Sequence, residues 1–484
     1  MRLFRNRLAL LGGAAALLSP TPVLADTLKD ALVSAYNTNP TLQSARANQR
    51  ATDESVPINR ASGLPSLSAN GSYTEQLKDS VPDLTDSTAN RSVAAGLSLS
   101  VPIYSGGSVR NSVKAAETRV GAGQADLRGT ESSVFSTVVA AYMDVILNES
   151  LVSLATNNVN VLGVNLQSTS DQFQIGNLTR TDVAQSESRL AIAQSDLRTA
   201  QANLANARER YIQQVGIVPS DLQAPPPLPG LPKSPEDAVS TALDDNPDVL
   251  AAHERSKAAD YDIDVAGAGR LPTVELFSNG NYNNSLGTTP GLASIYPNSY
   301  SSASAGVRAT IPLFQGGRPA AQERQAQARS AAALEDEIGT ERSVIAQVRS
   351  AWSSLEAANS VIQSSQKAVS ATELSLEGTR AENTVGNRTI LDILNAQQEL
   401  LNAQVQLVTA RRNAYVAGFT LLAAMGHAEA RDLGLADETL LYDPDVNYKR
   451  VRHKIWDWAM DPDPVAQSTR TVDTPTQGSE IPKQ

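Results

Sequence analysis

Residues 134–173 read VFSTVVAAYMDVILNESLVSLATNNVNVLGVNLQSTSDQF, and their apolar side chains recur in alternating steps of three and four. The clearest row takes every seventh residue: Val138, Val145, Val152, Val159, Leu166 and Phe173. This spacing predicts a long helix that packs lengthwise against another helix.

A second row of apolar residues begins beyond Gly176. It consists of Val183, Leu190, Leu197, Leu204 and Tyr211, with Ala193, Ala200 and Ala207 between them. Because large and small side chains alternate, two helix axes can approach each other closely. Residues 134–211 are therefore predicted to form an antiparallel helical hairpin that turns at Gly176 and Asn177.

The same features occur twice along the chain. Asn39-Pro40 returns 207 residues later as Asn246-Pro247. The run VPIYSGG at 101–107 returns 210 residues later as IPLFQGG at 311–317, and Gly176-Asn177 returns as Gly386-Asn387. A nearly constant offset over this length indicates a tandem duplication. We assign 26–223 to repeat one, 224–235 to a proline-rich linker and 236–426 to repeat two.

Each repeat is predicted to contain a helical segment, a β-hairpin and a long helical hairpin, in that order. The β-hairpins are expected at about 67–103 and 273–313, and the long helical hairpins at about 108–216 and 318–426. Apolar and polar residues alternate within the β segments, which predicts strands with one apolar face. The helix at 108–173 would be roughly 100 Å long. Since the return helix at 180–215 is shorter, we expect the helix at 40–61 to continue it end to end.

The two ends of the chain differ from the repeats. Residues 1–25 carry three arginines and then an apolar run, the pattern of a secretory signal peptide. Residues 427–460 are expected to form an equatorial-type segment, in which a basic and aromatic cluster at 449–458 packs as an outer belt around the helices. Residues 461–484 are polar, which favours a disordered tail.

Composition excludes several classes of function. The net charge of −11 argues against a nucleic-acid partner. The chain has no cysteine, so disulfides and thiolate metal sites are excluded, and its three histidines lie far apart in sequence. No catalytic constellation is recognisable, and we expect no enzymatic activity, no cofactor and no metal.

Four amphipathic strands per chain indicate a shared membrane barrel. In a bilayer, strands persist only in a closed barrel, and about eight strands is the smallest barrel observed. One chain cannot close such a barrel, whereas a dimer would supply eight strands and a trimer twelve. A soluble fibrous rod with small β caps is the alternative.

The chain resembles the TolC family of outer-membrane efflux and secretion ducts over nearly all of its length beyond residue 25. The resemblance depends on the duplication, on VPIYSGG and IPLFQGG, and on the two turns at 175–182 and 385–394. It implies a mixed α+β membrane protein: a homotrimer with one 12-stranded barrel in outer-membrane lipid and an α-helical tunnel in the periplasm of a Gram-negative bacterium. It also implies a periplasmic adaptor and an inner-membrane RND pump or ABC exporter as partners. The lack of cysteine separates the chain from the lipid-anchored branch of this family.

The resemblance also implies roles for residues at the hairpin tips. Gly176, Asn177, Gly386 and Asn387 would dock the adaptor, and both glycines would also serve as left-handed helix C-caps. Thr181, Asp182, Asn383 and Arg388 would form the periplasmic gate, with Arg388 bonding a neighbouring hairpin near Thr181 and Asp182. Asp392 would line the lumen as a ring of charge. For the two aspartates, ordinary charge balance at a helix N-terminus is the alternative.

The sequence departs from the family pattern at two gate positions. Asn383 stands where an aromatic bridging residue often occurs, and Asn395 where a second acidic residue can occur. We therefore expect a weaker closing network. The predicted function is a passive exit duct for drugs or secreted polypeptide, opened by partner contact. A constitutive diffusion porin and a surface or fibre protein outside the membrane are the alternatives.

Overall fold

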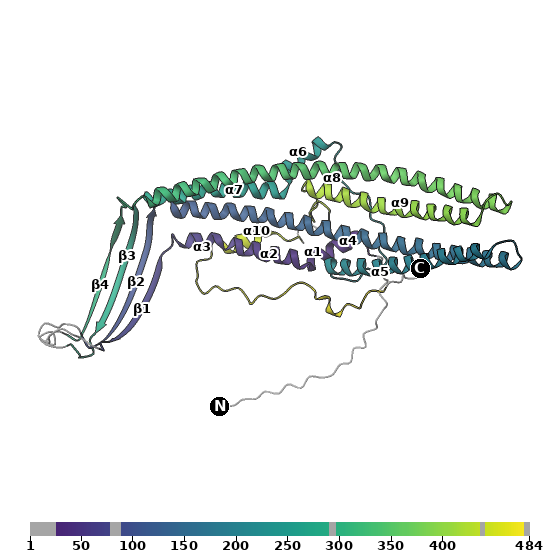
Figure 1. Ribbon diagram of the computed structural model, residues 1–484. Helices are drawn as coiled ribbons and strands as arrows, with labels where there is room; N and C mark the ends of the chain where they lie inside the picture. The colour runs from purple at the N-terminus through teal and green to yellow at the C-terminus, as the bar shows by residue number, and fades with distance from the viewer. Residues whose placement is uncertain (1–25, 78–88, 290–296, 436–440, 479–484) are drawn as a thin grey trace, which may run out of the picture.

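The computed structural model describes residues 26–77, 89–289, 297–435 and 441–478. The molecule is a long rod with a four-stranded sheet at one end and, at the other end, the turns of two helical hairpins (Figure 1). Repeat one comprises α1 (Leu28–Thr38), α2 (Pro40–Asp53), α3 (Ser55–Ala61), β1 (Ser66–Glu75), β2 (Arg91–Ser105), α4 (Ser108–Gln174) and α5 (Arg180–Val215). Repeat two comprises α6 (Pro235–Asp245), α7 (Pro247–Gly267), η1 (Ala268–Arg270), β3 (Thr273–Asn284), β4 (Ser299–Thr310), α8 (Arg318–Thr384) and α9 (Ile390–Ala424). The predicted signal peptide lies outside the described residues.

The long helices have the predicted length and pairing. α4 and α8 contain 67 residues each, about 100 Å at ~1.5 Å per residue. α4 packs against α5 and α8 against α9, while α7 and α9 both contact α4 and so join the two hairpins. Val138 and Val145 of the predicted row are fully buried, but Phe173 is 43% exposed. The row is thus buried in the middle of α4 and exposed near the tip, where the α4–α5 hairpin extends past the main core.

The repeated Asn-Pro pairs form joints between helices. Asn39 caps α2 by accepting from the Thr41 amide at 2.9 Å, and its own side-chain amide donates to the Gln214 carbonyl near the end of α5 at 2.9 Å. Asn246 does the same in repeat two, where its side-chain amide donates to the Ala424 carbonyl at 2.8 Å. The proline that follows occupies the first helical position, where its missing N–H is tolerated. The predicted end-to-end stacking of these helices is confirmed.

The strands form one antiparallel sheet in the order β1-β2-β3-β4. Pairs such as Leu67↔Leu99 and Leu276↔Val307 lie directly opposite each other. β2 is longer than β4 because it pairs with β3 as far as Ser105, around a bulge at Pro102. The prediction that the last strand reaches 313 was wrong. β3 begins at Thr273, which pairs with Thr310, so the chain beyond Thr310 runs past the end of its neighbouring strand, and Pro312 lacks an amide donor.

The main core lies in the middle of the rod, where α1, α4 and α5 meet the segment after α9. Its largest buried side chains include Phe135, Tyr142, Leu204 and Tyr211. The Tyr142 hydroxyl lies 2.6 Å from the Gln223 carbonyl and 3.0 Å from the Asp26 carbonyl, which ties the start of repeat one to its end. By composition alone, α4 is long and apolar enough to cross a membrane. Its packing in this core accounts for that apolar stretch.

The C-terminal segment follows the predicted course only in part. α10 (Pro444–Val451) packs on α2, but Trp456 and Trp458 are exposed, so they do not pack as a belt on this protomer's helices. Residues 461–478 were expected to be disordered. In the structure they run as an extended strap that contains η4 (Thr471–Asp473) and reaches α5, where the Gln477 amide donates to Glu209 at 3.1 Å (Figure 1). Residues 479–484 lie outside the described residues.

Candidate functional site

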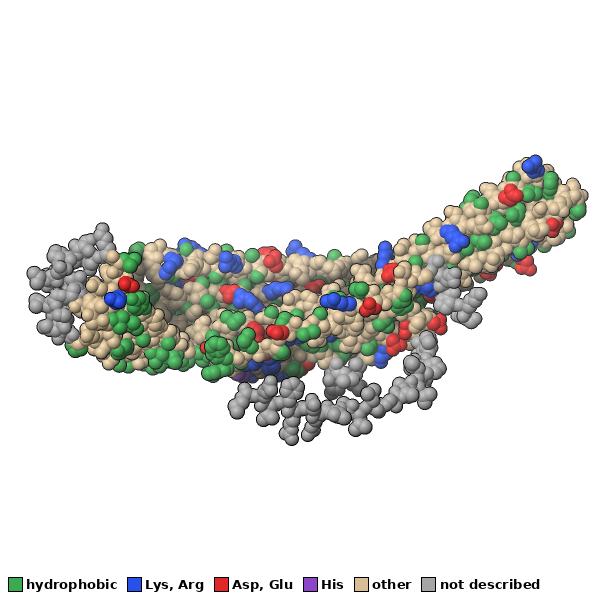
Figure 2. All heavy atoms as spheres, turned by 90° about the horizontal axis from the view of Figure 1, so that it is seen from below, with side chains coloured by type: hydrophobic (Ala, Val, Ile, Leu, Met, Phe, Trp, Pro, Cys, Tyr) green, Lys and Arg blue, Asp and Glu red, His purple; other side chains and the backbone are tan. Residues whose placement is uncertain are grey.

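The sheet has one apolar face and one polar face. Residues opposite each other in an antiparallel pair point to the same side. The register therefore places these side chains on one face: Leu67, Tyr73, Val93, Leu97, Leu99, Val101, Val274, Leu276, Tyr282 and Val307. Many of them are well exposed, and hydrophobic side chains gather over this end of the molecule in Figure 2, whereas charged side chains are scattered along the helices.

The opposite face of the sheet is mostly serine, asparagine and threonine. It also carries Glu275, which accepts from Ser100 at 3.0 Å and from Arg308 at 2.8 Å. Arg308 in turn lies over the Phe277 ring, with its guanidinium carbon 4.9 Å from the ring centroid. The sheet thus separates an apolar environment from an aqueous one. β1 and β4 each leave one edge without a strand partner among the described residues.

Both hairpin tips are built by the same pair of caps. At the end of α8, the amide of Gly386 donates to the Asn383 carbonyl at 2.9 Å and that of Asn387 donates to the Glu382 carbonyl at 3.0 Å. The amides of Gly176 and Asn177 make the equivalent bonds at the end of α4. Gly176 and Gly386 have φ of 83° and 81°, so their predicted role as left-handed caps is confirmed.

The helices that leave the tips begin with capping boxes. The Asp182 carboxylate accepts from the Thr179 amide at 2.9 Å and hydroxyl at 2.7 Å, and Asp392 accepts from Thr389 at 2.9 and 2.8 Å. These bonds lower the pKa of both aspartates. Each carboxylate therefore has a local structural role as a helix cap, whatever it contributes to a gate. Thr181 is exposed beside its cap.

Arg388 is paired within its own turn. Its Nε donates to Glu382 at 2.7 Å, and the side-chain amide of Asn383 donates to the Arg388 carbonyl at 2.7 Å. The expectation that Arg388 bonds a neighbouring hairpin stays a prediction. Glu382 was missed by the sequence analysis, although its position six residues before Arg388, across a tight turn, was an available signal.

The two helical hairpins of one chain contact each other a short distance from the tips, on the side toward the sheet. Leu394 of α9 is buried against Leu162 and Ala193 of the first hairpin. Arg189 of α5 donates to the side-chain oxygen of Asn395 at 3.1 Å. Asn395 thus supplies a neutral hydrogen-bond acceptor at a contact between hairpins, where an acidic residue would supply a charged one.

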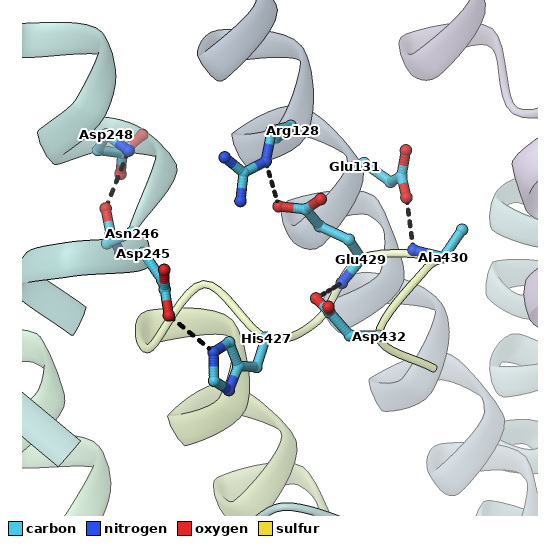
Figure 3. A network of polar contacts seen from close by, with 9 residues as sticks. All are labelled: Arg128, Glu131, Asp245, Asn246, Asp248, His427, Glu429, Ala430 and Asp432. Carbon is cyan, nitrogen blue, oxygen red and sulfur yellow. Dashed lines mark hydrogen bonds and ion pairs between the residues drawn. The ribbon is translucent and has the colours of Figure 1, made fainter. Parts of the chain in front are cut away.

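A polar junction lies where the end of α9 turns back onto α4 (Figure 3). Arg128 binds Glu429 at 2.6 Å, and Glu131 accepts from the Ala430 amide at 2.6 Å. Burial raises the pKa of Glu131 to about 7, against the effect of that hydrogen bond, and burial also raises the pKa of Glu429. His427 lies 3.1 Å from Asp245, beside the Asn246 joint of repeat two. Within the described part of the chain, no group of His, Asp or Glu is arranged to hold a metal ion.

A family model described as outer membrane efflux protein matches residues 31–216 and again residues 238–427. The chain belongs to the outer membrane efflux protein family. The two matches coincide with the tandem duplication, and they confirm the resemblance to the TolC family.

Relatives of known name cover almost the whole chain. The outer membrane efflux protein BepC of Brucella suis biovar 1 (strain 1330) is 34% identical over 447 residues, which cover 91% of this chain and 95% of BepC. Outer membrane protein TolC of Escherichia coli (strain K12) is 26% identical over 478 residues, 94% of each chain. The alkaline protease secretion protein AprF of Pseudomonas aeruginosa is 25% identical over 452 residues, 89% of this chain and 91% of AprF.

Solved structures show the same fold. The Campylobacter jejuni CmeC outer membrane channel superposes with a TM-score of 0.72 at 18% identity, over 88% of this chain and 89% of CmeC. The Neisseria gonorrhoeae MtrE outer membrane channel gives a TM-score of 0.67 at 23% identity, over 82% and 88%. The fold is thus the TolC-like combination of a helical tunnel with barrel strands. This family member is an outer-membrane protein that extends into the periplasm, and its relatives are channel proteins rather than enzymes.

Proposed function

We propose that three copies of this chain close into one 12-stranded barrel and a continuous helical tunnel, which serves as a passive exit duct. The observation that supports this is the four-stranded sheet, with its apolar face in register and its two open edges. An open edge in hydrocarbon leaves backbone groups without hydrogen bonds, so β4 of one copy pairs with β1 of the next. The alternating apolar and polar faces then separate lipid from a water-filled lumen.

The size of the lumen favours a trimer over a dimer. About eight strands enclose a space that side chains alone fill, whereas larger barrels leave an aqueous channel. A dimer would supply eight strands and a trimer twelve, since each chain has four. The polar face of this sheet carries serine, asparagine and the Glu275–Arg308 ion pair, which require water or further polar partners. Native mass measurement in detergent tests the number, and a mass of two chains would contradict it.

The hairpin tips are proposed as the docking surface and the gate. Gly176, Asn177, Gly386 and Asn387 are exposed at the end far from the sheet, where a periplasmic adaptor would reach them. Because the chain has no cysteine, a single Asn387→Cys variant can be cross-linked without background. Capture of an adaptor subunit is expected. Capture only by a cysteine placed at mid-helix, such as Ser354→Cys, would contradict docking at the tips.

Conductance in planar bilayers tests the gate. Arg388→Ser should raise the open probability if Arg388 holds a neighbouring protomer near Thr181 and Asp182. Glu382→Gln separates this role from the local ion pair, because it frees Arg388 without removing it. If Arg388 holds a neighbouring protomer, Arg388→Ser should open the channel and Glu382→Gln should not. If both variants open it alike, the local pair is the relevant contact. Arg411→Ser, on α9 and roughly 35 Å away along the helix, is the matched control.

The cargo is proposed from the relatives. BepC is named an efflux protein and AprF a protease secretion protein, so both an RND pump and an ABC exporter are candidate inner-membrane partners. Deletion of the gene, followed by assays of drug sensitivity and of secreted protein, distinguishes the two. A channel that conducts constitutively and whose loss changes neither would instead be a diffusion porin.

A further inference from the structure

Residues 454–461, here called the Trp loop, present a set of large apolar side chains to solvent. Ile455, Trp456, Trp458 and Met460 are between 72% and 86% exposed. A group of this kind on a folded surface usually marks an interaction site, because single exposed apolar residues are common but clusters of large ones are not. The structure contains no residue packed over them within its described parts.

The Trp loop is held in a defined shape at its base. Asp461 binds Arg450 through both oxygens at 2.7 Å and Lys454 at 3.2 Å, so an ion-pair clasp joins the two ends of the loop. Inside it, the Ala459 amide donates to the Trp456 carbonyl at 3.1 Å. A preorganised loop loses less conformational entropy when its apolar side chains are buried against a partner.

The Trp loop lies at the membrane end of the helical part. Arg60 of α3 donates to the Arg452 carbonyl at 3.3 Å and lies 2.6 Å from His453. α3 ends at Ala61 and β1 begins at Ser66, so this contact is only a few residues from the point where the chain enters the sheet. Figure 1 shows the segment after α10 passing beneath α3 at the same end as the strands. On α3 itself, Ile58 is 67% exposed.

The charges around the Trp loop favour an anionic lipid surface as the partner. Residues 449–461 contain four cationic side chains, of which Lys449 pairs with Asp445 and both Arg450 and Lys454 pair with Asp461. Among the described residues, the cations beside the loop that lie outside these ion pairs are Arg452 and Arg60, which meet at this contact. Lysine and arginine next to tryptophan are typical of the water–lipid interface, where the ring is buried at headgroup depth and the cation binds phosphate. Asp457 faces solvent between the two tryptophans and limits the depth of insertion.

We propose that the Trp loop is a membrane-interface anchor that inserts into the inner, phospholipid leaflet of the outer membrane beside the barrel. It would fix the height of the helical tunnel relative to the bilayer, with one loop from each copy of the chain. This inference depends on the outer-membrane location of the sheet, but not on the number of strands in the barrel or on the identity of the cargo.

Tryptophan fluorescence in full-length protein tests this proposal, because the chain has only three tryptophans. Trp352 lies in α8, roughly 50 Å along the helix from its barrel end. The protein is reconstituted into vesicles of phosphatidylethanolamine and phosphatidylglycerol with bromine on the acyl chains near the headgroups. A Trp352→Phe variant, which keeps the loop tryptophans, should lose at least half of its emission relative to unbrominated vesicles. A Trp456→Phe/Trp458→Phe variant, which keeps Trp352, should lose little.

Two results would overturn the proposal. Emission quenched by aqueous iodide but not by brominated lipid would place the loop in water. Emission quenched by neither would place it against protein, such as a second copy of the chain. Single-channel conductance of the same preparation separates these failures from a failure of the duct itself. Asp461→Asn weakens the ion-pair clasp and should reduce quenching by brominated lipid. Unchanged quenching would show that the clasp is not needed for insertion.

Discussion

Replacement of Glu131 by glutamine should change the pH dependence of stability. In the folded protein, burial at the polar junction raises the pKa of Glu131 from an ordinary 4.5 to about 7. Each pKa unit corresponds to about 1.36 kcal/mol, so the difference amounts to about 3 kcal/mol per chain as an upper figure. Because the folded-state pKa is the higher one, this penalty is absent below pH 4.5. It grows between pH 4.5 and 7 and is constant above pH 7.

Glutamine cannot ionise, and its side-chain oxygen can still accept the 2.6 Å hydrogen bond from the Ala430 amide. Wild type and Glu131→Gln should therefore have similar melting temperatures in detergent at pH 4. At pH 8 the variant should be more stable by about 2–3 kcal/mol. Glu335→Gln, which changes an exposed carboxylate on α8, is the control and should leave the stability at pH 4 and at pH 8 the same as in the wild type. An equal difference between wild type and Glu131→Gln at pH 4 and pH 8 would refute the argument from burial.

Four further substitutions test the tips and the core. Gly386→Ala places a side chain at φ of 81° and should destabilise the hairpin tip by about 1 kcal/mol, measured by local amide exchange. Its control is Gly378→Ala within α8, which should stabilise that helix by about 1 kcal/mol. Tyr142→Phe removes the hydroxyl that bonds two main-chain carbonyls and should lower stability by about 1–3 kcal/mol in thermal denaturation. Phe135→Ala opens a cavity in the main core and should lower it by about 3–5 kcal/mol, and a loss below 1 kcal/mol would contradict its full burial.

The sequence predicted those parts of the fold that depend on periodicity. The faces of the strands follow from alternation, and the register places the expected apolar set on one side. The turns at Gly176 and Gly386 follow from a glycine at the end of a long apolar row. In both cases the structure depends on residues close together in sequence, because alternation requires an extended strand and a glycine after a helix favours a left-handed cap.

Contacts between distant segments were not predictable in this way. The end of β4 at Thr310 depends on where β3 begins, which periodicity within β4 does not reveal. Arg60 and His453 are 393 residues apart, so the place of the Trp loop beside α3 could not be inferred from its composition. The Asn-Pro pairs were recognised as a repeat, but their role as joints requires the Gln214 and Ala424 carbonyls to be positioned by other helices.

The two tips share their backbone geometry but not their charges. Glu382 and Arg388 of repeat two correspond to Gln172 and Leu178 of repeat one at the 210-residue offset, so within the described residues this ion pair occurs at the second tip and has no counterpart at the first. This pair is exposed, and such pairs are weak and easily screened by salt. A closed state that depends on it would require little work to open. If a partner docks at the neighbouring Asn387 as proposed, breaking this pair would add little to the work of moving the tip.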